Sequence, residues 1–309
     1  MMGMDSLTPL ILTVITASTP LLFAATGELV TERAGVLNLG VEGLMVVGAL
    51  AAFAGTYVSG SAIIGVICGI LAGVLLAFVF GFLTLTLLAN QVATGLALTI
   101  FGLGLTSLLG VGYVGVTVHD LPRLDIPGIS DLPFIGPVLF AQDALVYLSF
   151  GALIAVAWVL QHTRIGLVLR AVGVSHDSAH ALGYGVIRIR YLATMFGGAM
   201  GGLSGAYLSL VYTPMWAENM TAGRGWIALA LVVFSTWRPY RLLVGAYLFG
   251  AITVIQLHAQ GLGVAIPSQF LSMTPYLATI LVLVAISRDK MKIRLNAPAC
   301  LGRSFRPTQ

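Results

Sequence analysis

Most of the polar side chains that could do chemistry in this sequence stand inside or beside long apolar runs. The clearest case is Gly35–Gly43 (GVLNLGVEG), which carries an amide at Asn38 and a carboxylate at Glu42. A helix through this segment would place these two side chains, four positions apart, on one face. Its three glycines favour an interrupted helix or a close approach of two backbones. A carboxylate inside an apolar span indicates function by default, although polar groups also bond neighbouring helices together.

Two further polar clusters interrupt apolar runs. Asn90–Gly95 (NQVATG) is either a plain turn or the unwound end of a helix at a cavity. Thr221–Trp226 (TAGRGW) begins another apolar run, from the opposite side of the membrane to Gly35–Gly43. Broken helices on opposite sides of two halves are typical of transporters with inverted repeats. From these clusters we predict solute-pathway residues, namely Asn38, Glu42, Asn90, Gln91 and Thr94.

A long loop, 162–190, carries the signals of a short helix. Ser175 is a suitable N-cap, Asp177 stands in the favourable first turn, and Gly183 can end the helix. Such a rigid element suits the docking of a partner. The residues predicted to couple to that partner are Arg164, Arg170, Ser175, Asp177 and Gly183.

The same loop contains His176 and His180, four positions apart with Asp177 between them, much like the zinc motif HExxH. A zinc site needs a third ligand, and that chemistry normally uses the longer Glu as its base. We therefore predict no metal site, and a membrane enzyme using the two histidines is the less favoured alternative. The sequence also has no GxxxxGK[ST] loop, and its two lysines are Lys290 and Lys292. ATP must then be bound by a partner, or an ion gradient must supply the energy.

Composition excludes several classes of protein. Of 309 residues, 58% are hydrophobic and 8% are charged, against about 25% charged in an average soluble domain. This excludes a soluble enzyme, a nucleic-acid binder and a disordered regulator. The formal net charge of +4 is small. The sequence therefore predicts an all-α polytopic membrane protein.

About nine apolar runs are candidate membrane spans, of which the seventh is short against the roughly 20 residues that a crossing helix needs. They are 8–26, 35–55, 61–88, 91–112, 143–161, 191–212, 225–236, 242–260 and 273–287. We predict a single transmembrane domain over 1–287, with a turn at Gly27–Ala34, followed by a basic tail over 288–309.

The positive-inside rule gives the orientation. Lys and Arg gather in the tail, in the 162–190 loop and in Trp237–Arg241, whereas the 113–142 loop has only Arg123. The tail and the 162–190 loop are thus predicted to be cytoplasmic, and the N-terminus to lie outside.

Several blocks resemble the ABC-importer permeases of the ribose/branched-chain amino-acid class, especially the nucleoside (simple sugar) subgroup. They are Glu32–Gly43, Ala89–Leu98, Thr163–Gly173, Ala222–Ala230 and Pro275–Leu277, and together they span nearly the whole chain.

The resemblance implies an importer subunit in the cell membrane that moves a small polar solute, most of all nucleosides, by alternating access. It is not itself an enzyme and needs no cofactor, since a separate ATPase binds ATP. It also implies a second, non-identical permease and an extracellular substrate-binding lipoprotein as partners. One departure is Gly173-Val174-Ser175 in place of Gly-Glu-Asn, so Asp177 would supply the acidic contact to the ATPase. The alternative is a secondary transporter in which Glu42 carries a coupling proton.

Overall fold

The described residues form a bundle of helices. The computed structural model describes residues 4–118, 136–261, 267, 269–270, 273–287 and 296–306. Within these ranges there is no β-strand, and only two isolated bridges join residues 114 and 117 to residues 216 and 215. The predicted all-α class is confirmed. Most of the 113–142 loop and residues 288–295 of the tail lie outside the described ranges.

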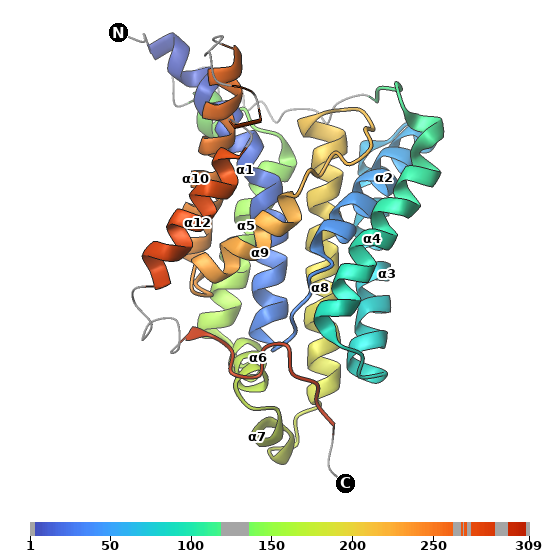
Figure 1. Ribbon diagram of the computed structural model, residues 1–309, viewed down its shortest axis with the longest axis vertical. Coiled ribbons are helices and arrows are strands. Elements are labelled where there is room, and N and C mark those ends of the chain that lie inside the picture. The colour runs from blue at the N-terminus through green and yellow to red at the C-terminus, as the bar shows by residue number, and fades with distance from the viewer. Residues whose placement is uncertain are drawn as a thin grey trace.

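The long helices run up and down the bundle, as Figure 1 shows. In chain order the described helices are α1 (Met4–Arg33), α2 (Val41–Ser59), α3 (Ala62–Gly81) with the π-helix η1 (Phe82–Thr86), α4 (Gln91–Gly110) with the 3₁₀ turn η2 (Val111–Tyr113), η3 (Gly136–Phe140), α5 (Ala144–His162), α6 (Arg164–Val174), α7 (His176–Ala181), α8 (Val186–Tyr207) with the π-helix η4 (Leu208–Tyr212), α9 (Arg224–Phe234), α10 (Pro239–Gly261) and α12 (Thr274–Ser287).

Helix α8 is the centre of the bundle and packs against α1, α2 and α3. Small residues let these backbones meet. Gly202 of α8 lies against Gly48 of α2 and Gly69 of α3, and Gly205 lies against the backbone of Met45. Close contact between small residues is how membrane helices associate without a strong hydrophobic force between them.

Six helices among the described residues are long and apolar enough to cross a membrane: α1, α2, α3 with η1, α4 with η2, α5 and α10. Helix α9 is apolar but has only 11 residues. The predicted count of about nine spans is therefore not confirmed.

One local prediction is wrong. Gly27–Ala34 is not a turn, because α1 continues to Arg33. The helix continues because both of its buried carboxylates accept hydrogen bonds: Glu28 from the Asn38 N–H (3.2 Å) and Glu32 from Trp237 Nε1. Of the two arrangements considered for Gly35–Gly43, the structure shows the interrupted one: Asn38 and Glu42 do not share a helix, because the chain is irregular over residues 34–40 and α2 begins at Val41.

Two other predictions are confirmed. The chain is interrupted before Glu42, by a largely buried segment over residues 34–40 that we call the α1–α2 linker. The short helix in the 162–190 loop is α7, and Ser175 caps it by accepting a hydrogen bond from the Ser178 N–H (3.2 Å). Figure 1 places α6 and α7 together at one end of the bundle, here called the α6–α7 end.

Candidate functional site

The carboxylate of Glu42 is buried where the starts of two helices meet. It belongs to the first turn of α2 and is 3% exposed. One oxygen accepts hydrogen bonds from the Thr221 hydroxyl (2.5 Å) and the Gly223 N–H (2.8 Å), and the other from the Gly225 N–H (2.6 Å). Glu42 therefore caps the N-terminus of α9 from a different part of the chain.

The local sequence around α9 builds this cap. Gly223 has a φ of +81°, a conformation that L side chains rarely adopt, and it turns the chain into α9. Gly225 lies so near to α2 that a Cβ on it would stand 2.5 Å from the Glu42 nitrogen. The first N–H groups of a helix have no partner within the helix and attract a negative charge. The protein's own carboxylate occupies this anion-binding position.

The α1–α2 linker is held by side chains from α1 and α4 and by its own Asn38. The Gln91 side chain accepts from the Leu37 N–H (2.8 Å), and the Thr99 hydroxyl donates to the Leu39 carbonyl (3.1 Å). Asn38 is buried, and its side chain accepts from the Gly40 N–H (2.9 Å) while its own N–H donates to Glu28. These bonds satisfy backbone groups that a broken helix would otherwise leave unpaired in the membrane.

The structure brings together only some of the predicted pathway residues. Asn38 and Gln91 meet at the linker, and Glu42 follows it. Asn90 is exposed and caps α4 by accepting from the Ala93 N–H (3.0 Å), and Thr94 is half-buried. The pathway role of these five residues stays a prediction.

The predicted site residues leave out three buried polar residues of this region: Glu28 and Glu32 in α1, and Thr221, which belongs to the polar cluster Thr221–Trp226. The first two were assigned to a turn. The signal that could have identified them is the helical spacing of Glu28 and Glu32, which places both carboxylates on one face of a helix.

The predicted coupling residues lie on α6, on α7 or beside them. Arg164 and Asp177 are exposed, and Arg170 is half-buried and donates to the Gly166 carbonyl (3.3 Å). Gly183 has a φ of +84° and donates to the His180 carbonyl (2.8 Å), so it ends α7 as expected. Their contact with an ATPase stays a prediction.

The two histidines do not form a metal site with other ligands in the described part of the chain, where no group of three or more His, Cys, Asp or Glu could hold a metal. His176 is buried and His180 is exposed, and the Phe305 ring contacts both imidazoles edge-on (5.5 and 5.6 Å between centroids). The pKa of His176 is lowered to about 4, mainly by burial and also by the nearby charges of Arg190 and Arg303, while the charge of Asp177 acts in the opposite direction.

This lowered pKa gives a testable pH dependence. Between pH 6.5 and 4 the unfolded chain binds a proton at His176 and the folded chain does not, so stability falls as the pH falls through this window. We expect His176→Gln to lose part of the decrease in melting temperature that the wild type shows over the window. His180→Gln, which changes an exposed imidazole, is the matched control and keeps the wild-type slope. Equal slopes for wild type and His176→Gln would refute the assignment.

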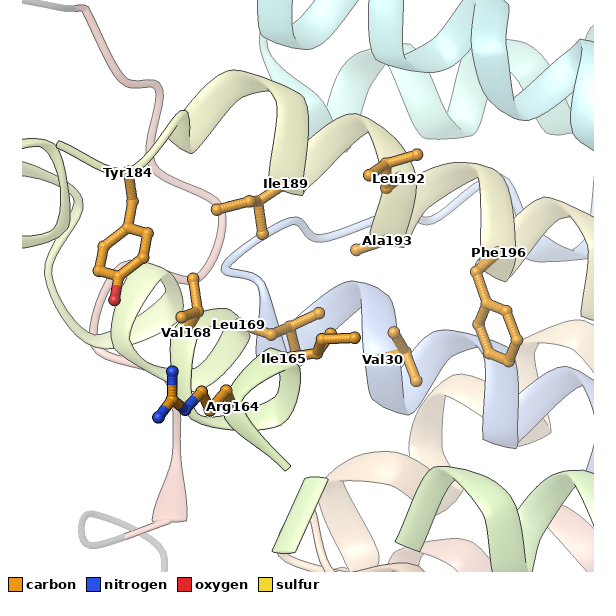
Figure 2. A pocket seen from close by; sticks show the side chains of 10 residues that line it. All are labelled: Val30, Arg164, Ile165, Val168, Leu169, Tyr184, Ile189, Leu192, Ala193 and Phe196. Atoms are coloured by element: carbon orange, nitrogen blue, oxygen red, sulfur yellow. The ribbon is translucent and has the colours of Figure 1, made fainter. Parts of the chain in front are cut away.

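A cavity of about 550 Å³ opens at the α6–α7 end, between α1, α6 and α8. Figure 2 shows apolar side chains from all three helices converging on it, with Arg164 and Tyr184 toward one edge. Its wall is made almost wholly of apolar side chains, such as those of Ile165, Leu169 and Phe196. It therefore offers few groups that could recognise a polar solute.

The broken helix before α2, the short apolar helix α9 capped by Glu42, and the many apolar helices define a multi-pass membrane transport protein. The profile of the family described as "Branched-chain amino acid transport system / permease component" matches residues 10–286. The chain belongs to this family. It is the permease subunit of an ATP-binding cassette (ABC) importer, a translocation component and not an enzyme.

Relatives of similar length support this assignment. The chain is 42% identical to the provisionally named glucose ABC transporter permease protein TsgC13 of Haloferax volcanii, over 94% of this chain and 95% of that protein. It is 32% identical to the nucleoside ABC transporter permease protein NupC of Lactococcus lactis (86% and 88% covered). It is 30% identical to the guanosine ABC transporter permease protein NupQ of Bacillus subtilis (85% and 87% covered). No solved structure matches. Membership implies an ATPase partner and a substrate-binding protein.

Proposed function

We propose that this permease imports nucleosides, with simple sugars as the second candidate class. The names of NupC and NupQ support nucleosides, and the name of TsgC13 supports a sugar. The two classes share a hydroxyl-rich ring, which short polar contacts in a membrane pathway would recognise. The observation that carries the transport role is the meeting of the α2 and α9 starts at Glu42.

In this proposal the pathway passes the α1–α2 linker and the start of α9. Asn38 and Gln91 hold the interrupted backbone in shape, and Glu42 caps the start of α9. Asn90 and Thr94 stand at the start of α4, beside Gln91. The solute crosses along the interface with a second, non-identical permease, after delivery by an extracellular substrate-binding lipoprotein. ATP is bound by the ATPase partner alone.

The α6–α7 end is proposed to face the cytoplasm, with the tail on the same side. The argument is the positive-inside rule. The arginines described in α6, at the start of α8 and in residues 296–306 are Arg164, Arg170, Arg188, Arg190, Arg303 and Arg306. The ATPase would dock on α6 and α7, where Arg164 and Asp177 are exposed.

Reconstitution tests the proposed function. The chain is co-expressed with its proposed partners, the ATPase, the second permease and the binding protein, and the purified complex is placed in liposomes. We expect ATP-dependent uptake of radiolabelled guanosine or another nucleoside, insensitive to collapse of the proton gradient. Uptake of glucose alone would favour the second class of substrate. Uptake that needs the proton gradient and no ATPase would overturn the proposal in favour of a secondary transporter using Glu42.

The proposed docking of the ATPase on α6 and α7 leads to a separate prediction. Asp177→Lys reverses a charge on exposed α7 and should weaken ATPase binding about tenfold, or about 1.4 kcal/mol. The matched control is Glu218→Lys, which makes the same charge change on an exposed residue before α9, away from α6 and α7. Co-purification of tagged ATPase measures both. Equal recovery of the ATPase with both variants would refute docking through Asp177.

A further inference from the structure

The end of the chain returns across the α6–α7 end and contacts several elements there. We call residues 296–306 the C-terminal strap. Figure 1 shows it passing α6 and reaching the base of α8. The Cys300 N–H donates to the Gly173 carbonyl at the end of α6 (2.9 Å), and the Gly302 N–H donates to the Gly35 carbonyl in the α1–α2 linker (3.2 Å). Cys300 and Gly302, two residues apart, thus bond the strap both to the proposed docking region, formed by α6 and α7, and to the α1–α2 linker.

Two side chains join the strap to the linker a second time. The Arg190 guanidinium donates to the Arg303 carbonyl (2.9 Å) and to the Gly35 carbonyl (3.0 Å). The Gln91 side chain donates to the same Arg303 carbonyl (3.4 Å) and accepts from the Leu37 N–H (2.8 Å). Arg190 is 2% exposed, so its bonds form away from solvent, where they are stronger than at the surface.

Phe305 anchors the far end of the strap on the docking region. Its side chain is buried in one cluster with Val172 of α6, Ala179 of α7 and Val186 of α8. Its ring also contacts both histidines of α7, as described above. Burial of an aromatic ring between three helices fixes their relative positions more firmly than a single hydrogen bond does.

We propose that the C-terminal strap is a coupling element, which transmits movement of α7 to the α1–α2 linker and so to the Glu42 region. The inference rests on the proposed function, since it takes α6 and α7 as the ATPase-docking surface. The strap suits this role because its contacts to the two regions follow one another closely along the chain and include two buried side chains, Arg190 and Phe305. Phe305 acts as a positioning residue: it touches no solute and works through α7.

Hydrogen–deuterium exchange on the purified permease tests the link without any transport. We expect Phe305→Ala to raise exchange in α7 and also in the α1–α2 linker, although Phe305 itself contacts the cluster of α6, α7 and α8. Ser304→Ala, an exposed neighbour in the same strap, is the matched control and should change neither. If Phe305→Ala does not fold, Phe305→Leu, which keeps an apolar side chain, is measured in its place. Faster exchange in α7 alone would overturn the proposal, and so would no change.

The transport measurement uses the reconstituted complex. We expect Phe305→Ala to lower solute uptake per ATP hydrolysed severalfold while the ATPase still co-purifies, with Phe305→Leu intermediate and Ser304→Ala unchanged. A parallel fall in uptake and ATP hydrolysis caused by loss of the ATPase would show a purely structural strap and overturn the proposal. If the wild type itself shows no ATP-dependent uptake, the proposed function fails, and the exchange result still decides whether the strap links the two regions.

Discussion

Glu42→Ala is expected to yield a permease that does not reach a stable fold. The change removes the acceptor of three hydrogen bonds and leaves the Thr221 hydroxyl and the N–H groups of Gly223 and Gly225 facing a buried gap. Each buried donor without a partner costs about 1–3 kcal/mol, so the sum is about 5 kcal/mol. That is comparable with the whole stability of many domains.

A conservative substitution at Glu42 and a control at another glutamate show how much of the loss of stability comes from the missing acceptor. Glu42→Gln keeps one acceptor oxygen but turns an NH₂ group toward a backbone N–H, whichever way the amide is oriented, so we expect intermediate stability. Glu218→Ala is the matched control, because Glu218 is exposed and accepts one hydrogen bond, from Ser107 (2.6 Å). Loss of this exposed hydrogen bond should lower the free energy of unfolding by less than about 1 kcal/mol.

Thermal unfolding in detergent, followed by size-exclusion chromatography of the soluble fraction, measures these differences. A Glu42→Ala protein that melts like the wild type would show that the cap of α9 contributes little to stability. If that protein also transported normally, the pathway role of Glu42 would be refuted. If it folded and failed to transport, the pathway role would gain direct support.

Gly205→Ala is the second large expected effect. A single methyl group on Gly205 would overlap the Met45 carbonyl oxygen and stand 2.6 Å from the Ala49 nitrogen. Both atoms are backbone of α2, so the strain can be relieved only by moving one helix away from the other. Overpacking of this kind costs about 1–3 kcal/mol or more, and here it opens the central α2–α8 contact.

The control for Gly205→Ala is the same substitution where there is room. Gly104 of α4 is a helical glycine with nothing within 4 Å of an added Cβ. Because alanine favours the helix over glycine by about 1 kcal/mol, Gly104→Ala should leave the melting temperature unchanged or raise it. A drop in melting temperature of the same size for both variants would show that helix packing at Gly205 is not the cause.

The sequence predicted the apolar elements well because hydrophobic run length sets helices in a membrane protein. The starts of α4 and α5 fall within one residue of their predicted positions, and α7 has the predicted Ser175 cap. The break before Glu42 was also predictable, since three glycines in nine residues disfavour a continuous helix.

What the sequence did not predict depends on contacts between distant residues. Glu28 and Glu32 were assigned to a turn because they are charged, and only the Asn38 N–H and Trp237 Nε1 make them tolerable inside a helix. The same holds for Glu42, whose partners begin at Thr221. The strap could not be predicted either, because a basic tail gives no periodic signal and its contacts are mostly with backbone carbonyls.

The cap on α9 has a consequence for how the protein is made. All three donors to Glu42 come from residues 179 or more positions later in the chain. When α2 leaves the ribosome and enters the bilayer, the groups that hold its carboxylate have not yet been synthesised. Insertion of α2 and completion of its surroundings are therefore separate events, and a nascent chain stopped before Thr221 should be exposed to membrane quality-control proteolysis.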